Sequence, residues 1–214
     1  MKLKKEHCVL YAVTDRKWSE GTTLARQVEA ALRGGVTMVQ LREKELSGEA
    51  LEKEALEIQK LCRAYGVPFL INDNVALAEK IGADGVHVGQ NDMEAGAVRA
   101  LLGPDKIIGV TAKTVEQAQA AEEAGADYLG SGAVFGSATK ADAISMDPDL
   151  LDRICDSVKI PVVAIGGIHA GNVARLKGRK ISGVAVVSGI FANPDIEKGT
   201  RALKSLVMET IPKS

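Results

Sequence analysis

The sequence predicts an α/β fold, a single (β/α)8 TIM barrel that takes up residues 1–214 as one catalytic domain. Two observations support this fold. Eight short apolar runs alternate with segments of helical periodicity, at about 27 residues for each strand and helix unit. Helix ends that contain glycine recur just before the apolar runs, and the triplet Gly-Ala-Asp stands in that place twice, at 82–84 and 125–127. The alternative is an open, doubly wound sheet, which normally has about five or six strands.

The eight expected strands are the apolar runs themselves. They are Cys8–Val13, Met38–Leu41, Pro68–Ile71, Gly85–Val88, Ile107–Val110, Tyr128–Val134, Val162–Ile165 and Gly183–Val187. A helix or a helix start is expected after each of them.

Three of the expected helices carry clear start signals. Apolar residues return every three or four positions from Ser47 to Tyr65, which predicts an amphipathic helix with Ser47 as its N-cap. Asp147-Pro148 predicts another start, with proline at or near the first helical position. Asn193-Pro194-Asp195 repeats this signal for the last helix.

The composition excludes several classes of protein. The 27 Lys plus Arg against 28 Asp plus Glu give a net charge of -1, which argues against a general nucleic-acid binder. Cys8, Cys62 and Cys155 lie far apart, so a disulfide framework or a zinc site is disfavoured and a cytoplasmic location is expected. No apolar run is long enough for a membrane span. Self-association into a homo-oligomer stays open.

In such a barrel the active site lies where the strands end, so each strand–helix junction can be read in turn. Side chains alternate along a strand, and therefore Gln40 and Arg42 share one face while Val39 and Leu41 share the other. The apolar face should meet the helices, which leaves Gln40 and Arg42 directed into the barrel mouth. Lys44 follows in the same junction, and a solvated charge cluster is its alternative reading.

The next two junctions each contain an Asn-Asp pair. Asp73 and Asp92 are hard oxygen ligands that suit Mg²⁺, although paired carboxylates can also act as acid and base, or cap the following helices. The cations at nearby junctions favour the metal, because they imply a polyanion to neutralise. Asn74 is expected to be only a helix cap. His87 is read equally well as a hydrogen-bonded barrel histidine or as a ligand contact.

The later junctions predict anion sites. Gly166-Gly167 and Ser188-Gly189 end consecutive strands, where barrels often bind phosphate through backbone N–H groups, although tight turns are the alternative. Ser137, Thr139 and Lys140 form a hydroxyl-and-cation loop after the sixth strand that suits an anion, with a polar turn as the alternative. The residues therefore predict one backbone-based anion site and one cationic site with a divalent metal, which fits a diphosphate substrate and a monophosphate co-substrate.

With these motifs in order along the chain, the sequence resembles the thiamine-phosphate synthase family over almost its full length. The matching segments are Gln40–Lys44, Ile71–Asp73, Gly85–Asp92, Thr139-Lys140 and Ile165–Ile168. The family joins hydroxymethylpyrimidine diphosphate to a thiazole monophosphate, so the resemblance implies that thiamine phosphate and diphosphate are the products. It further implies that diphosphate leaves first, that a pyrimidinylmethyl cation forms, and that the thiazole nitrogen then attacks.

The resemblance also implies roles for individual residues. Asp73 and Asp92 would hold one Mg²⁺ in each subunit. Arg42, Lys44 and Lys140 would be catalytic through their charge and, with Asn72, would bind the diphosphate. Other substrate contacts would be Gln40 and Thr111 on the pyrimidine, with Ser137, Thr139, Gly167, Val187 and Ser188 on the thiazole phosphate.

The sequence departs from the family pattern at two junctions. Lys113 stands where the family commonly has histidine, and Gly136 replaces a proline before the Ser137 loop. Three other functions compete with the synthase: a thiazole tautomerase relative, another phosphate-binding barrel such as a sugar-phosphate epimerase, and an inactive thiamine-phosphate sensor. Arg42, Lys44, Asp73, Asp92 and Lys140 argue against the first two, and turnover distinguishes the third.

Overall fold

The computed structural model describes residues 2–19, 21–136 and 146–211. Within them, eight parallel strands close into a barrel in chain order, each paired with its sequence neighbours and β1 with β8. The strands are β1 (Leu10–Val13), β2 (Met38–Leu41), β3 (Phe69–Asn72), β4 (Gly85–Val88), β5 (Ile107–Thr111), β6 (Tyr128–Gly132), β7 (Val162–Ile165) and β8 (Gly183–Val186). The predicted barrel is confirmed, and the open sheet is excluded.

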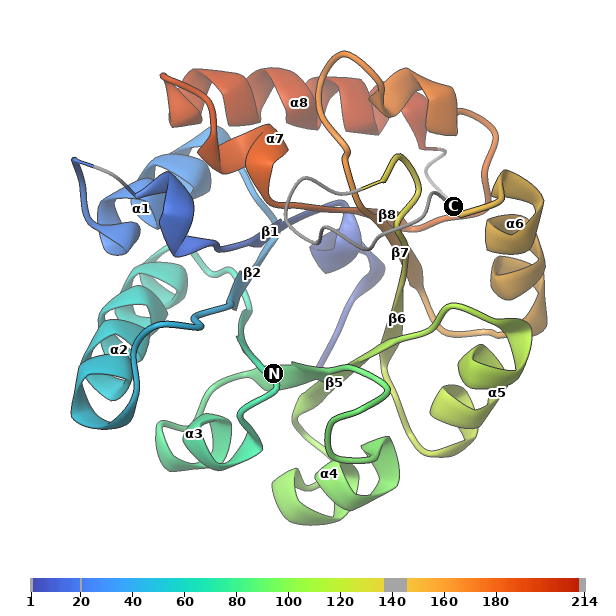
Figure 1. Ribbon diagram of the computed structural model, residues 1–214, viewed down its shortest axis with the longest axis horizontal. Helices are drawn as coiled ribbons and strands as arrows, with labels where there is room; N and C mark the ends of the chain where they lie inside the picture. Colours follow the sequence, from blue (N-terminus) through green and yellow to red (C-terminus); the bar gives the residue numbers. More distant parts are fainter. Residues whose placement is uncertain (1, 20, 137–145, 212–214) are drawn as a thin grey trace.

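Helices surround the barrel, as Figure 1 shows in a view along it. They are α1 (Leu24–Gly34), α2 (Gly48–Ala64), α3 (Val75–Lys80), α4 (Ala95–Leu102), α5 (Val115–Glu123), α6 (Pro148–Ser157), α7 (Ser188–Phe191) and α8 (Ile196–Thr210). Short 3-10 helices are η1 (Lys5–Cys8), η2 (Arg16–Trp18) and η3 (Val173–Leu176). None of the helices in these residue ranges is both long and apolar enough to cross a membrane.

The expected helix starts are partly right. Asp147 caps α6 and Pro148 opens it, as predicted. Asp195 caps α8 through Lys198 N, so Pro194 precedes that helix and does not begin it. Ser47 occupies the N-cap position of α2 but makes no capping hydrogen bond through its side chain. Between β7 and β8 the chain forms only the 3-10 helix η3, where an α-helix or a helix start was expected.

Two apolar layers hold the barrel. Alternate strand residues, such as Leu10 and Ala12, pack outward against the helices. Their neighbours Tyr11 and Val13 face the inside of the barrel. The same alternation applies in β2, where Met38 belongs to the inner layer and Val39 to the outer one.

The repeated Gly-Ala-Asp triplets close the barrel at the start of its strands. Each triplet begins with a glycine at positive φ, 64° for Gly82 and 90° for Gly125, which ends the preceding helix. The aspartate that ends each triplet then accepts a hydrogen bond from the backbone of the neighbouring strand. Asp84 Oδ2 accepts from Phe69 N at 3.0 Å, and Asp127 Oδ2 accepts from Ile108 N at 2.7 Å.

The hydrogen bonds of Asp84 and Asp127 differ in one respect that predicts how much each contributes to stability. Asp127 also pairs with Arg99 at 2.7 Å, and Arg99 in turn bonds the carbonyl oxygen of Gly125. Asp127→Ala should therefore lower the free energy of unfolding by about 2–3 kcal/mol, and Asp84→Ala by about 1 kcal/mol. Urea denaturation of both variants checks this order. Equal losses would mean that the Arg99 pair adds nothing.

Candidate active site

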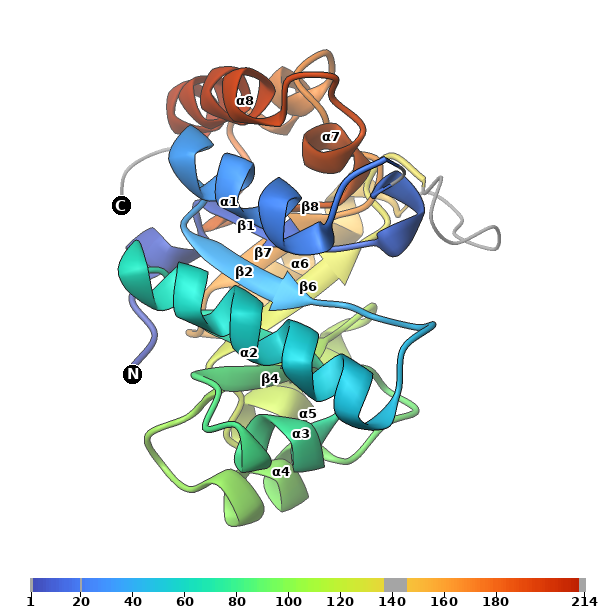
Figure 2. The ribbon, with the colours of Figure 1, turned by 90° about the vertical axis from the view of Figure 1, so that its left-hand side faces the viewer.

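The charged and polar residues predicted for the site gather at the carboxyl ends of the strands. The arrowhead of β2 in Figure 2 points toward this rim, while η1 lies at the opposite end. The predicted residues within the described chain come from six junctions: Gln40, Arg42, Lys44, Asn72, Asp73, His87, Asp92, Thr111, Gly167, Val187 and Ser188. Ser137, Thr139 and Lys140 lie outside the described residues.

Asp73 stands immediately after β3 with a backbone that few residues adopt. Its φ is 61°, in the left-handed region, which aspartate tolerates better than most side chains. The strand ends at Asn72, so both side chains reach the same place, and Asn72 Nδ2 donates to Asp73 Oδ2 at 2.5 Å. Lys44 Nζ from the previous junction donates to the same oxygen at 3.2 Å. Local strain of this kind is typical of functional positions.

Asp73 and Asp92 interact electrostatically at this rim. Burial raises the pKa of Asp73, and the nearby Asp92 carboxylate raises that pKa further, whereas Lys44 acts in the opposite direction. Asp92 Oδ2 also accepts from Gly89 N at 2.7 Å. A carboxylate whose charge is disfavoured by a second carboxylate beside it is a suitable ligand for a divalent cation.

This pair fits Mg²⁺ better than zinc. No group of three or more His, Cys, Asp or Glu side chains suited to a metal occurs among the described residues. Mg²⁺ commonly takes only one or two protein carboxylates, with the remaining positions filled by water and phosphate oxygens. The capping alternative does not account for either residue, because Asn74 Oδ1 caps α3 through Leu77 N and Glu94 holds the N-cap position of α4.

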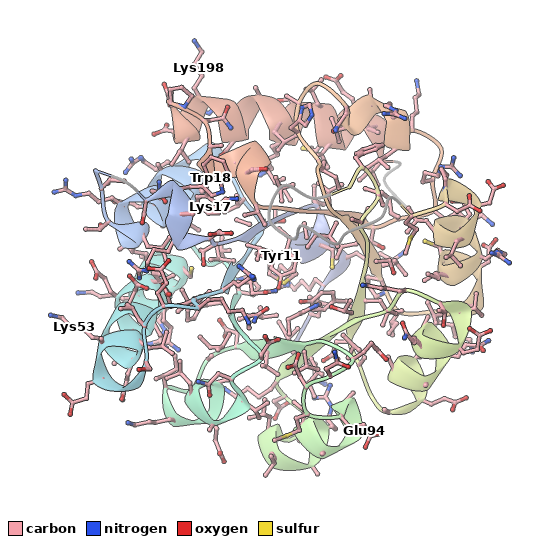
Figure 3. All side chains as sticks on the ribbon, in the orientation of Figure 1. Tyr11, Lys17, Trp18, Lys53, Glu94 and Lys198 are labelled. Carbon is pink, nitrogen blue, oxygen red and sulfur yellow. The ribbon has the colours of Figure 1, made fainter. Side chains whose placement is uncertain are left out.

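A chain of hydrogen bonds crosses the inside of the barrel beneath this rim. Gln40 is 4% exposed and donates to the Tyr11 hydroxyl, which bonds the Tyr128 hydroxyl at 2.8 Å. Tyr128 then bonds His87 Nδ1 at 2.9 Å, and His87 Nε2 bonds Thr111 Oγ1 at 3.0 Å. Figure 3 shows Tyr11 near the middle of the barrel. Three predicted site residues are thus joined through two tyrosines.

The two tyrosines are contacts that sequence reasoning missed, because both stand inside apolar strand runs. Burial raises the pKa of both phenols above the usual range, so both hydroxyls stay protonated at neutral pH. Gly109 makes room for the Tyr128 ring, since a Cβ at that position would overlap the phenol. The predicted inward direction of the Gln40 side chain is confirmed. His87 is a hydrogen-bonded histidine inside the barrel, and its contact with a ligand stays a prediction.

The junctions after β7 and β8 also come together. Gly166 and Gly167 have φ values of 108° and 65°, and Asn172 Nδ2 binds the carbonyl oxygen of Gly167 at 2.8 Å. Ser188 is the first residue of α7, and a hollow of about 620 Å³ opens beside it. The hollow is lined by His169 and Ala170 after β7, by Ser188 and Gly189 in α7, and by residues leading into and along α8.

A closed barrel with carboxylates, cations and glycine turns at the ends of its strands defines the chain as a (β/α)8-barrel enzyme. Comparison with known proteins makes this specific. The chain belongs to the thiamine monophosphate synthase family, whose sequence profile matches residues 10–190. The members of this family are transferases, and so is this enzyme.

The similarity to individual relatives extends over nearly the whole chain. The thiamine-phosphate synthase of Clostridium tetani strain Massachusetts / E88 is 43% identical over 206 residues, which is 96% of this chain and 99% of the relative. That of Ruminiclostridium cellulolyticum is 45% identical over 203 residues, 95% of this chain and 96% of the relative. The solved thiamine phosphate pyrophosphorylase of Pyrococcus furiosus has a TM-score of 0.89 at 35% identity, covering 97% and 99% of the two chains.

The interior chain of hydrogen bonds gives a testable consequence. Tyr128→Phe leaves the Tyr11 hydroxyl and His87 Nδ1 without their shared partner, so the free energy of unfolding should fall by about 1–3 kcal/mol. Tyr65→Phe is the matched control, because Tyr65 is 43% exposed at the end of α2 and should change stability by less than about 0.5 kcal/mol. Chemical denaturation compares the two variants, and similar values would show that the buried hydroxyl is dispensable.

Proposed function

We propose that this enzyme joins hydroxymethylpyrimidine diphosphate to hydroxyethylthiazole phosphate and releases diphosphate, forming thiamine phosphate. The observation that carries the proposal is the gathering of two carboxylates and two cations at three consecutive junctions. Lys44 Nζ lies 3.2 Å from Asp73 Oδ2, and the Asp92 carboxylate raises the pKa of Asp73. A monophosphate needs less charge than this, which argues against an isomerase acting on a sugar monophosphate. The similar proteins from Clostridium tetani and Pyrococcus furiosus, a thiamine-phosphate synthase and a thiamine phosphate pyrophosphorylase, point to the same reaction.

The proposed reaction is a dissociative substitution. The bond between the methylene carbon and the diphosphate oxygen breaks, and its electron pair leaves with the diphosphate. The thiazole nitrogen then donates its lone pair to the resonance-stabilised pyrimidinylmethyl cation, and the new C–N bond forms. No protein nucleophile is needed, in keeping with the raised pKa of about 12 that burial gives each cysteine thiol.

In this proposal the chain's own residues act through charge and position. Arg42, Lys44 and Lys140 stabilise the charge that develops on the departing diphosphate. Asp73 and Asp92 would hold one Mg²⁺ in each subunit, and the ion would supply Lewis-acid stabilisation of the diphosphate.

The remaining predicted residues bind the two substrates. Asn72 contacts the diphosphate, and Gln40, His87 and Thr111 line the pyrimidine side. Ser137, Thr139, Gly167, Val187 and Ser188 hold the thiazole phosphate, with backbone N–H groups at the glycine turns as the main donors. The three unpaired cysteines suit an enzyme that works in the cytoplasm.

The direct test is product formation. Purified protein with both substrates and Mg²⁺ should form thiamine phosphate and release diphosphate in equal amounts, as measured by chromatography. Removal of the metal with EDTA should abolish turnover, and added Mg²⁺ should restore it. Binding of the substrates without any product would instead indicate an inactive sensor, and the absence of product under these conditions refutes the synthase.

The carboxylate pair can be tested by one conservative change. Asp92→Asn keeps an oxygen that can accept from Gly89 N but removes the charge, so turnover should fall about 100-fold or more. Stability should change by less than about 1 kcal/mol. Glu94→Gln removes a charge two residues away, from a side chain that points outward in Figure 3, and should leave turnover unchanged. Equal activity of Asp92→Asn, with the same Mg²⁺ requirement, would remove Asp92 from the metal site.

A further inference from the structure

The segment Arg42–Ser47, which joins β2 to α2, carries the two described cations of the proposed diphosphate site but has little structure of its own. It forms neither helix nor strand. Within the described chain, residues 43–46 make no hydrogen bond from backbone to backbone. A loop of this kind would normally sample many conformations, and ordering it on binding would cost affinity.

Glu43, which lies between Arg42 and Lys44 in the sequence, orders the loop through the hydrogen bonds of its carboxylate. Its side chain is 1% exposed although Lys44 and Glu45, which follow it in the loop, are exposed. Oε1 accepts from Glu45 N at 2.6 Å and from Leu46 N at 3.1 Å. One carboxylate oxygen thereby fixes the backbone of the loop tip.

The second oxygen ties the loop to two other elements. Arg16 Nε in η2 donates to Glu43 Oε2 at 2.6 Å. Arg16 Nη2 donates to both oxygens of Glu54 in α2, at 2.7 and 2.6 Å. The planar guanidinium thus joins the carboxylate of the loop to the helix that follows it, a geometry for which arginine is suited and lysine is not.

The neighbouring residues form a second, parallel link. Asp15 Oδ2 lies 3.6 Å from Arg42 Nη1, so the residues that precede Arg16 and Glu43 in the sequence also pair with one another. Thr14 Oγ1 accepts from Arg42 N at 2.9 Å and donates to Arg42 O at 3.1 Å. Three successive residues after β1 therefore fix two successive residues after β2.

We infer that Glu43 is a positioning residue, which with Arg16 holds the loop in the conformation that presents Arg42 and Lys44 to a diphosphate. This inference rests on the proposed function for the identity of the ligand. A buried carboxylate is costly unless all its oxygens are bonded, and here each oxygen has a partner. The backbone N–H groups and Arg16 lower the pKa of Glu43 even though burial acts to raise it, so the group stays charged at neutral pH.

The test uses Glu43→Gln in the full-length enzyme. The amide oxygen can still accept from the loop backbone, but the amide NH₂ then faces the N–H of Arg16, so the hydrogen bond that ties the loop to Arg16 is lost. The KM for the pyrimidine diphosphate should rise about tenfold, while kcat and the KM for the thiazole phosphate stay within about threefold of the wild type. A merely structural role would lower the melting temperature and the active fraction and leave both KM values unchanged, which would overturn the inference.

Two further variants complete the test. Arg16→Lys keeps the charge but cannot bridge Glu43 and Glu54, so the same KM should rise by a smaller factor, and this variant serves if Glu43→Gln fails to fold. Glu52→Gln removes the 2.6 Å pair of α2 with Lys80, away from the loop, and should change neither KM.

Binding of inorganic diphosphate separates this inference from the proposed function. In the presence of Mg²⁺, calorimetry should give an affinity about tenfold weaker for Glu43→Gln than for the wild type. If the wild type binds diphosphate but makes no thiamine phosphate, the proposed reaction fails, while the comparison of affinities still tests the positioning role of Glu43. Equal diphosphate affinities of the two proteins would overturn the positioning role of Glu43 even in an active enzyme.

Discussion

Closure of the parallel sheet is the constraint on which the candidate site depends. Because every strand runs in the same direction, the residues that follow the strands meet at one rim although they are far apart in the sequence. The strands are only four or five residues long, so a shift of one residue would move a site side chain to the helix-facing layer. The register of β3 against β4 is fixed directly at the candidate site. There Asn72 pairs with His87, and Asp73 N donates to the carbonyl oxygen of His87 at 2.9 Å.

Much of this fold could be predicted because its signals are local. Short apolar runs mark buried parallel strands, and three of the expected strands match the observed bounds, namely Met38–Leu41, Gly85–Val88 and Val162–Ile165. The errors occur where tertiary context decides. Pro194 suits a first helical turn, yet the side chain of Asp195 supplies the cap and α8 begins one residue after it. Nothing local in the segment after β7 indicates that it forms only a short 3-10 helix.

The rim of the site was predictable from strand counting, whereas its support was not. Gln40 and Arg42 follow from the alternation of side chains, and Asp73 and Asp92 from their places in the junctions. Tyr11 and Tyr128 are 117 residues apart and look like ordinary apolar positions, so only the closed barrel brings their hydroxyls together. Glu43 was visible in the motif, but its role depends on Arg16, a residue 27 positions earlier on another junction.

The ion pairs around the rim are of two kinds, and the difference follows from solvent exposure. The Lys44 side chain is 57% exposed in its pair with Asp73, and a pair so exposed contributes only about 0–1 kcal/mol. Such a pair is readily exchanged, so in the proposed function Lys44 would turn to the diphosphate while Asp73 and Asp92 would take a divalent cation. The Glu43 side chain is almost fully buried, and breaking its pair with Arg16 would leave a desolvated carboxylate without its cationic partner. In the proposed function the exposed Lys44–Asp73 pair would therefore face the ligand, and the buried Arg16–Glu43 pair would maintain the geometry of the loop that carries Lys44.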